Sequence, residues 1–537
     1  APAIALGDGK VAVGSTLALP ELTVGMQAAT GTLPAGTPRV AAYQFTDQTA
    51  GGGYFTLNGV TKASGVAFTV AADQLHNVKW VGGSAAGTDT VQVQALDALG
   101  NTWGTGDSST MTTVAIPSNL LVTPEVRVNS YTSGPQQFAD VAVLADGGHV
   151  VVWMSEGQAG PYGAVYGQRY GVDGTKVGGE FLVVATGYSG YMPSVSALAG
   201  GGFVAVWAAG GLDGSDWGVG GQRFDASGAK VGGQFVVNSQ TAGGQWRPDV
   251  TGLSNGGFVV VIEDVQSAEI SLRLYGADGQ PRGADYTWVN VATGTGVRET
   301  MPAVSALPGG GYVVTWMGVD SSSEGIRARI FDANGAPVGS EFIVNSYASF
   351  GQYTPAIATL VDGSFVISWH TGGVDSSDVG IAARRFSATG TPIGAEFVAN
   401  SYQTGAQQDA AVTALADGGF VISWQSMGQD GSGYGIYGQR YDAAGTKTGS
   451  EFRISDVAAQ DQRNVALAGR LDGGFVAAWE SDGQDGSSIG VYSRVYTPNM
   501  LPGAVNDIWG TESADTINAG NGPAKVQGLG GNDSIVG

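Results

Sequence analysis

A strand motif ending in an aromatic residue recurs along most of the chain. The segment Asp417-Gly-Gly-Phe-Val-Ile-Ser-Trp424 returns as Asp472-Gly-Gly-Phe-Val-Ala-Ala-Trp479, and five variants precede them. The last position of the motif falls at residues 153, 207, 262, 316, 369, 424 and 479, a spacing of 53 to 55 residues. A fixed period of this length is typical of proteins built from repeated structural units. The fold must therefore accommodate seven equivalent units.

Each unit predicts four short β-strands. In the sixth unit an apolar run at 411–415 precedes an Asp-Gly-Gly turn, which suits a tight hairpin, and the alternating strand 420–424 follows. A loop rich in Gly, Asp and Ser leads to a third strand at 435–441. The fourth strand is of the type Glu341-Phe-Ile-Val-Asn345. Four antiparallel strands repeated radially form a β-propeller, so we predict an all-β chain with a seven-bladed propeller over residues 123–500.

The two ends of the repeat region predict how the ring closes. The seventh unit has a third strand at 491–496 but no Glu-Phe-x-Val-Asn strand after it. A matching segment, Glu125-Val-Arg-Val-Asn129, stands before the first unit. We expect strand 125–129 to complete the last blade, which removes the free edge of an open array. A linear solenoid is the alternative, but it leaves this extra strand unexplained.

Composition narrows the class of partner. The net charge is −22, from 46 acidic and 24 basic residues, which argues against nucleic acid because phosphate binding requires clustered Lys and Arg. The absence of cysteine excludes disulfides, thiol catalysis and Cys-ligated metal sites. No apolar run is long enough to span a membrane as a helix. The 90 glycines, without a period of three, indicate many tight turns between strands.

The regions that flank the repeats have different patterns. Residues 1–120 contain strand-like runs such as 66–70, 90–94 and 111–115 between Gly-rich turns, which predicts a β-sandwich. In residues 505–537, Gly528-Leu-Gly-Gly-Asn-Asp-Ser-Ile-Val-Gly537 fits the nonapeptide G-G-x-G-x-D-x-U-x except at Leu529, and 510–520 is a degraded copy. This nonapeptide predicts the start of a parallel β-roll. Because the motif runs to the last residue, we interpret the sequence as a piece of a larger protein.

These segments resemble parts of one protein class. Residues 35–115, with Tyr54-Phe-Thr-Leu-Asn-Gly59, resemble the cadherin-like or immunoglobulin-like modules of large bacterial adhesins, and Asp89 and Asp97 are calcium ligands by that analogy. The nonapeptides resemble the calcium-binding repeats of RTX proteins, and the propeller units resemble repeats of such proteins. The resemblance implies a secreted protein, extracellular or on the bacterial cell surface, exported by a type I system, with Ca²⁺ as cofactor. Asp and backbone oxygens suit Ca²⁺, and the implied ligands are Gly528, Gly530, Asn532, Asp533 and Asp515.

A polar loop face is the predicted binding site of the propeller. In a propeller, the loops between strands two and three and the loops between blades emerge on the same side. Carboxylates and amides there suit the hydroxyls of a sugar, and aromatic rings stack on its faces; the alternative is that Asp, Gly and Ser simply form turns. The predicted ligand-binding residues are Asp213, Asp216, Trp217, Gln245, Trp246, Asp375, Asp378, Gln407, Asp430, Ser432 and Asp485.

The sequence leaves three functions open. We interpret the chain as a calcium-dependent adhesion module, not an enzyme, that binds a cell-surface glycan or a surface protein. A secreted polysaccharide-degrading lyase or hydrolase is the first alternative, and it would need His370, the one histidine expected near the loop face, together with nearby carboxylates. No H-E-x-x-H motif is present, and Gly486-Ser-Ser-Ile-Gly490 matches G-x-S-x-G only by chance in a repeated loop. A structural spacer without ligand is the other alternative.

Overall fold

The computed structural model divides the chain into two compact units, Ala1–Leu120 and Leu121–Gly537. In the second unit it describes residues 125–497 apart from 185–187, 290–298, 321–323, 348 and 375–378. Outside that range it describes shorter stretches, which are 9–12, 16–18, 42–47, 54–57, 60–63, 65–71, 78–81, 87–96, 102–114, 507–509, 516–518, 525–527 and 534–536. No helix in these described parts is long and apolar enough to cross a membrane.

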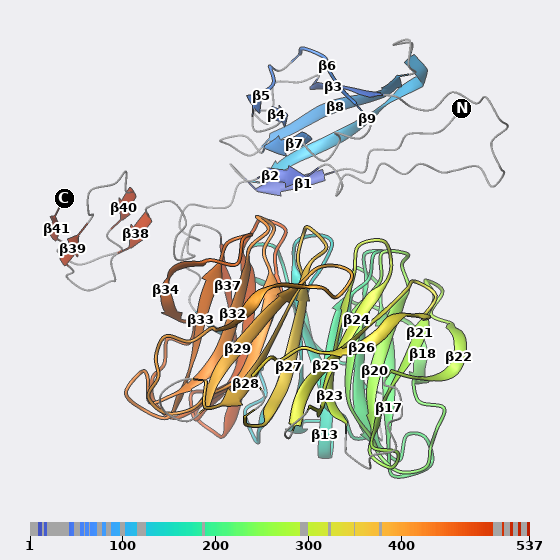
Figure 1. Ribbon diagram of the computed structural model, residues 1–537, viewed down its shortest axis with the longest axis vertical. Helices are drawn as coiled ribbons and strands as arrows, with labels where there is room; N and C mark the ends of the chain where they lie inside the picture. The colour runs from blue at the N-terminus through green and yellow to red at the C-terminus, as the bar shows by residue number, and fades with distance from the viewer. Residues whose placement is uncertain are drawn as a thin grey trace. The chain divides into compact units, whose positions relative to one another are not determined.

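Residues 125–497 form a seven-bladed β-propeller, which confirms the predicted all-β fold class (Figure 1). Each blade is a four-stranded antiparallel sheet, and six blades follow the order of the chain. Their strands are β11 (Gln136–Val143), β12 (His149–Gly157), β13 (Gly160–Tyr170), β14 (Lys176–Leu182); β15 (Tyr191–Ala197), β16 (Phe203–Gly210), β17 (Trp217–Phe224), β18 (Lys230–Val236); β19 (Gln245–Gly252), β20 (Phe258–Asp264), β21 (Glu269–Tyr275), β22 (Pro281–Trp288); β23 (Thr300–Ala306), β24 (Tyr312–Val319), β25 (Glu324–Phe331), β26 (Pro337–Ile343); β27 (Gln352–Thr359), β28 (Phe365–Gly372), β29 (Val379–Phe386), β30 (Pro392–Val398); and β31 (Gln407–Ala414), β32 (Phe420–Met427), β33 (Tyr434–Tyr441), β34 (Lys447–Arg453).

The seventh blade combines both ends of the repeat region. It contains β35 (Gln462–Gly469), β36 (Phe475–Asp482) and β37 (Ile489–Tyr496), and its outer strand is β10 (Val126–Arg127). Val126 pairs with Ser493 and Arg127 with Tyr492 in an antiparallel register. The inner strand β35 also packs beside β11 of the first blade. The ring is therefore closed by hydrogen bonds between segments that lie more than 350 residues apart.

The first strand of each blade is the innermost. Strands β11, β15, β19, β23, β27, β31 and β35 contact one another in sequence around the ring. Because successive strands are antiparallel, the inner strand begins on the same side of the propeller as the loop between the second and third strands. We call this side the loop face. It is the side on which the binding residues were predicted.

The Asp-Gly-Gly turns require glycine for local reasons. In the sixth blade Gly418 has a φ of 88°, a conformation that side chains disfavour. A Cβ on the next residue, Gly419, would lie 2.3 Å from the carbonyl oxygen of Tyr441. Asp417 Oδ1 accepts a hydrogen bond from the Gly419 N–H at 2.9 Å. Each of the three residues of this turn therefore has a separate local role.

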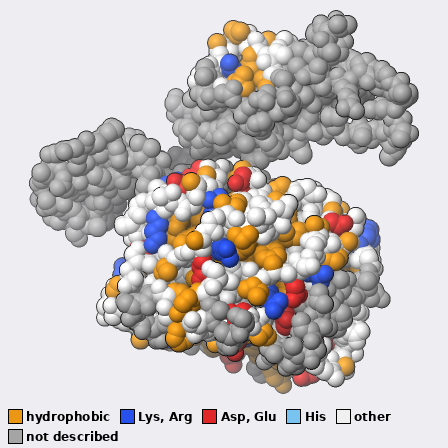
Figure 2. Space-filling model, viewed as in Figure 1, with side chains coloured by type: hydrophobic (Ala, Val, Ile, Leu, Met, Phe, Trp, Pro, Cys, Tyr) orange, Lys and Arg blue, Asp and Glu red, His pale blue; other side chains and the backbone are white. Residues whose placement is uncertain are grey.

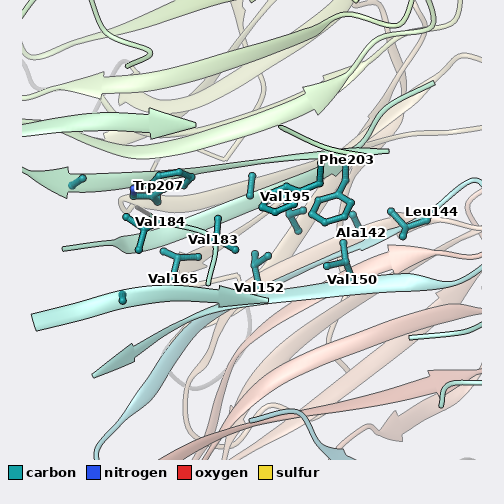
Figure 3. Packing of buried hydrophobic residues seen from close by; sticks show 14 residues of the cluster. Ala142, Leu144, Val150, Val152, Val165, Val183, Val184, Val195, Phe203 and Trp207 are labelled. Atoms are coloured by element: carbon teal, nitrogen blue, oxygen red, sulfur yellow. The ribbon is translucent and has the colours of Figure 1, made fainter. Parts of the chain in front are cut away.

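Aromatic and branched side chains fill the space between neighbouring blades. Trp153, Trp207, Trp316, Trp369, Trp424 and Trp479 are fully buried. Figure 3 shows one such core, in which Val150, Val152 and Val165 of the first blade face Phe203 and Trp207 of the second. Phe203, the first residue of β16, also stacks on Phe224 of β17, with ring centroids 4.6 Å apart. The recurring aromatics are thus core residues.

The recurring arginines of the third strands also connect blades. Arg329 and Arg384 donate to the carbonyl oxygens of Val289 and Val344 in the preceding blade, at 2.9 and 3.1 Å. Arg223 donates to the Ala277 oxygen of the following blade at 2.8 Å. On the side of the propeller seen in Figure 2, the charged side chains of the described residues are scattered among hydrophobic and uncharged groups. They form no large positive or negative area there.

The two flanking regions consist of short strands. In the first unit, β1 (Gly9–Ala12), β9 (Thr102–Val114), β8 (Gly87–Leu96), β3 (Ala42–Asp47) and β6 (Phe68–Ala71) form one sheet, and β2 (Thr16–Ala18), β7 (Val78–Val81), β4 (Tyr54–Leu57) and β5 (Val60–Thr61) form another. Near the other terminus, β38 (Asp507–Trp509) pairs in parallel with β40 (Lys525–Gln527), and β39 (Thr516–Asn518) with β41 (Ser534–Val536). Assignment of these regions to an Ig-like sandwich and a calcium-binding β-roll stays a prediction.

One blade departs from the aromatic pattern. His149 occupies the position of Phe203 and stacks on Tyr170 with ring centroids 4.5 Å apart and planes within 2°. It is 1% exposed, and neither ring nitrogen has a hydrogen-bond partner. Burial, reinforced by the charge of Arg470, lowers its pKa to about 3. The imidazole is therefore a neutral aromatic side chain whose polar atoms are buried without compensation.

We expect the His149→Phe variant to be more stable than the parent protein by about 1–3 kcal/mol at neutral pH, because two unsatisfied buried nitrogens are removed. The gain should increase in acid. Unfolded His149 takes up a proton below its ordinary pKa of 6.5, whereas the folded residue does not until about pH 3, so the parent loses stability between these values. Urea unfolding at pH 7 and pH 5 measures both effects. Phe203→His is the matched control and should be destabilising; equal stability of parent and His149→Phe would contradict the prediction.

Candidate functional site at the mouth of the central channel

A cavity of about 390 Å³ lies on the propeller axis towards the loop face. All seven inner strands contribute to its wall. Each strand provides consecutive residues that lie close to its first residue. The lining residues are Phe138, Ala139, Asp140, Met192, Pro193, Ser194, Arg247, Pro248, Asp249, Met301, Pro302, Thr354, Pro355, Asp409, Ala410, Asn464 and Val465. The cavity thus combines hydrophobic surface with a few charged and polar groups, as small-molecule sites usually do.

A β-bulge in every inner strand gives the cavity its shape. The pairing of each inner strand with the second strand shifts at this point. One residue per blade has a left-handed backbone with φ between 48° and 55°, and none of these residues is glycine; they are Phe138, Met192, Arg247, Met301, Thr354, Asp409 and Asn464. A left-handed conformation is costly for most of these residue types. We call these seven residues the bulge ring.

Side chains from the preceding blade hold part of the bulge ring in place. The residue after the recurring tryptophan accepts a hydrogen bond from the backbone N–H of the ring residue in the next blade. Glu480 accepts from Phe138 at 2.6 Å, Gln425 from Asn464 at 3.2 Å, and His370 from Asp409 at 3.4 Å. In the third blade, whose motif ends in Ile262, Glu263 accepts from Met301 at 3.4 Å.

His370 is therefore one of these inter-blade acceptors. Because a backbone N–H can only donate, its Nδ1 must be unprotonated in this contact, and the Thr354 hydroxyl bonds the same atom at 2.7 Å. Burial lowers the pKa of His370, and the nearby Asp409 opposes that shift. His370 does not line the cavity. The residue that the enzyme hypothesis required thus lies behind the wall of the site.

Two carboxyl groups lie in the cavity wall two residues after the bulge ring. Asp140 accepts from the N–H groups of Val195 and Val141, both at 2.8 Å. Asp249 accepts from Val304 at 2.8 Å and Val250 at 2.9 Å. Ser194 stands between them in the ring order and donates to Asp249 at 2.8 Å. The corresponding residue in the other four blades is alanine (Ala303, Ala356, Ala411 and Ala466).

The surroundings of these carboxyl groups favour their neutral forms. Removal from water raises the pKa of Asp140 to about 7, and repulsion from Asp249 adds to the effect, although hydrogen bonds from Val195, Val141 and Ser194 oppose it. Removal from water also raises the pKa of Asp249. A carboxyl group that changes protonation near neutral pH beside a second carboxyl group is suited to acid–base chemistry.

Arg247 is the one cationic side chain among the described residues that line the cavity. Its Nη1 lies 3.2 Å from Oε2 of Glu263, which is fully buried, and donates to the Thr300 hydroxyl at 3.1 Å. Thr300 in turn donates to the same Glu263 oxygen. Arg247 is therefore tied into a buried polar network at the edge of the cavity.

Several loop residues predicted to bind ligand belong to a repeated clamp. An Asn at the end of a fourth strand donates to a Gln seven residues later and to the Asp of the neighbouring loop. Asn238 thus donates to Gln245 at 2.9 Å and Asp213 at 2.7 Å. Asn129 does the same across the ring closure, to Gln136 at 2.9 Å and Asp485 at 3.2 Å. Asn400 donates to Gln407 at 3.0 Å.

The other predicted loop residues are more dispersed. Trp217 of the second blade packs on Trp246 of the third, with ring centroids 4.1 Å apart, so this pair is also a contact between blades. Asp430 accepts from the Ser432 N–H at 3.2 Å within its own loop, and Asp216 and Ser432 are exposed. Asp375 and Asp378 lie outside the described residues. None of the predicted residues lines the axial cavity, and their role in binding stays a prediction.

Sequence reasoning missed Asp140, Ser194 and Asp249. Their signal is a polar residue in three units where four units have alanine, and it becomes visible only when the units are aligned on the inner strand. The implied calcium ligands Asp515, Asp533, Asn532, Gly528 and Gly530 lie outside the described residues, as does Asp97, and the side chain of Asp89 is not described. Among the described residues, no group of three or more His, Asp or Glu side chains is arranged to hold a metal ion. Calcium binding stays a prediction.

Comparison with known proteins gives a likeness of fold alone. No family model and no curated protein matches the sequence. Among solved structures, a Dyadobacter fermentans protein of unknown function matches at 12% identity, over 70% of this chain and 98% of that one, with a TM-score of 0.44. The polysaccharide lyase Uly1 matches at 10%, over 71% and 95%, with a TM-score of 0.43. A Penicillium chrysogenum α-L-arabinanase complexed with arabinobiose matches at 14%, over 56% and 92%, with a TM-score of 0.39.

This comparison corrects the interpretation that the chain is not an enzyme. Proteins described as an arabinanase and a polysaccharide lyase are among the matching propellers, so the architecture does not set this chain apart from enzymes. The interpretation rested on the lack of a recognisable catalytic motif, and a site assembled from seven inner strands leaves no such motif in the sequence.

The clamp at Asn129 predicts that weakening the ring closure lowers the free energy of unfolding. We expect Asn129→Ala to lower the free energy of unfolding by about 1–3 kcal/mol, because Gln136 and the Val491 N–H, which bonds Asn129 Oδ1 at 2.8 Å, lose a buried partner. Asn238→Ala removes the same contacts within one continuous stretch of chain and serves as the matched control. Urea unfolding measures both. An unchanged stability for Asn129→Ala would show that the closing strand contributes little.

The hydrogen bonds between blades predict that glutamine can replace His370 without loss of stability. Gln425 occupies the equivalent position and accepts the equivalent hydrogen bond, so His370→Gln should retain stability within about 0.5 kcal/mol. His370→Ala leaves the Asp409 N–H without this acceptor and should cost about 1–3 kcal/mol. Chemical unfolding of the two variants distinguishes these cases. If both variants were equally stable, the contact would not hold the bulge ring.

Proposed function

We propose that the propeller cleaves a carbohydrate in the axial cavity, with Asp140 as the proton donor. One observation carries the proposal: Asp140 lines a cavity that also contains Asp249, and its removal from water there raises its pKa to about 7. Enzymes that break glycosidic bonds commonly use a pair of carboxyl groups, one of which must be protonated at the working pH. Asp249, whose negative charge raises the pKa of Asp140, would act in its ionised form.

The cavity has a size and surface suited to sugar rings. Its volume of about 390 Å³ lies within the range of small-molecule sites. Phe138, Met192 and Met301 offer apolar surface for the faces of a sugar ring. Thr354, Asn464 and the carboxyl groups offer hydrogen-bond partners for its hydroxyls. Both kinds of contact are required to hold a carbohydrate in water.

The proposal keeps the carbohydrate partner expected from the sequence and moves the site from the loops to the channel mouth. The adhesin-type parent protein, its extracellular location and its calcium-binding repeats stay predictions. A glycan held in the same cavity without turnover would return the chain to a binding role. The experiment below separates the two functions.

Turnover should depend on Asp140 and on its protonation. We expect Asp140→Asn to lower kcat by about 10²–10⁴-fold on whichever of arabinan, galactan, xylan or glucan the parent protein cleaves, as measured by release of reducing ends. Asp140 is protonated below about pH 7, so the rate of the parent protein should fall as the pH rises through 7. Far-ultraviolet circular dichroism checks that the variant folds.

Asp442→Asn is the control, because Asp442 is exposed in the turn between β33 and β34 and does not line the cavity. It should leave kcat unchanged. Full activity of Asp140→Asn would overturn the proposed catalytic role. Saturable binding of a glycan by the parent protein without cleavage would favour the binding function instead.

A further inference from the structure

The axial cavity holds more acidic than basic side chains, even when Asp140 is protonated as the proposed function requires. Asp140, Asp249 and Asp409 place three carboxyl groups in the lining, and Arg247 is the only basic side chain among the described lining residues. His370, 3.9 Å from an Asp409 oxygen, gives no compensating charge while its Nδ1 accepts hydrogen bonds. Glu480 and Glu263 stand directly behind the bulge ring. An anionic group that entered the cavity would meet acidic side chains from several blades.

Arg247 is already committed to a partner. Glu263 is fully buried and lies 3.2 Å from the Arg247 guanidinium. If Arg247 turned away to bind an anion, the fully buried Glu263 would lose that charge partner, which is strongly unfavourable. Nη1 of Arg247 is therefore held by Glu263 and Thr300, and an anion would meet only the remaining N–H groups of a guanidinium whose charge is already paired.

We infer that the glycan cleaved at this site is uncharged and that cleavage is hydrolytic, not eliminative. The inference rests on the proposed function and specifies its substrate and reaction. Elimination from a uronic acid removes a proton from the carbon next to the sugar carboxylate, and the negative charge spreads onto that carboxylate. A cation must neutralise this charge in the transition state. The described lining provides acidic groups and one engaged guanidinium.

Hydrolysis uses the groups that are present. The bond from the anomeric carbon to the bridging oxygen breaks, and the Asp140 proton passes to that oxygen, which leaves as a hydroxyl. A water molecule gives its oxygen to the anomeric carbon and its proton to a carboxylate, a role that this proposal assigns to Asp249. One water is consumed for each bond broken, and a final proton transfer through solvent restores both carboxyl groups. No oxidant, reductant or metal ion enters the balance.

A matched pair of ligands tests the charge requirement. Galactose oligomers and galacturonate oligomers of equal length differ only at the oxidised carbon, and glucose and glucuronate oligomers form a second pair. Binding is measured by calorimetry with Asp140→Asn and also with the parent protein under the same conditions. We expect the acidic member of a pair to bind at least about tenfold more weakly than the neutral member, and less so at high salt. Asp409→Asn should narrow the difference.

The products test the reaction type independently. Mass spectrometry should show that each cleavage by the parent protein adds one water, with no unsaturated, ultraviolet-absorbing product. Cleavage of galacturonate or glucuronate oligomers to unsaturated products would overturn the inference while leaving the axial active site intact. Equal or tighter binding of the acidic oligomers would also overturn it. If no glycan were bound or cleaved, the proposed function itself would fail and the inference with it.

Discussion

The packing of each blade on the next is the interaction on which the structure depends. A four-stranded sheet buries one face only if another sheet covers it, and here each second strand is buried on both sides by large side chains such as Trp207 and Trp424. The ring must close for the first and last blades to be covered as well. That requirement explains why β10, which precedes the first blade in sequence, pairs with β37 of the last. The Asn129 clamp then joins the two ends of the repeat region with the hydrogen bonds that other blades form locally.

Close packing of the inner strands produces the cavity. Seven strands cannot all approach the axis along their whole length, and each departs from regular pairing through a bulge at the same level. The left-handed residue at the bulge turns one side chain per blade towards the axis. Hydrogen bonds that the backbone donates to buried groups such as Glu480 hold it in its costly conformation. The shape of the site is thus maintained by contacts between blades, and the chemistry of its wall can vary without changing the shape.

The fold was predictable because the repeat specifies it locally in every unit. A period of 53 to 55 residues, an Asp-Gly-Gly turn and the displaced strand 125–129 suffice for a closed ring of seven blades. The axial site was not predictable in the same way. The loop residues Asp213 and Gln245 have the composition of a binding surface, but each is a hydrogen-bond acceptor of Asn238. Asp140 and Asp249 lie 109 residues apart in strands that look like ordinary core, and only the ring brings them to one cavity.

Departures from the repeat therefore indicate function better than the repeat itself does. A residue present in most blades, such as the clamp Gln, makes a contact that every blade requires. A residue present in few blades, such as Asp140, where four blades have alanine, is not required by the blade architecture. Its carboxyl group accepts backbone hydrogen bonds from Val141 and Val195, and removal from water still raises its pKa to about 7. Ser194 differs from its alanine counterparts in the same way, and both Ser194 and Arg247 lie in the same half of the ring as Asp140 and Asp249. A single asymmetric site is the arrangement that one bound sugar chain requires, and a symmetric ring could not distinguish the two sides of a glycosidic bond.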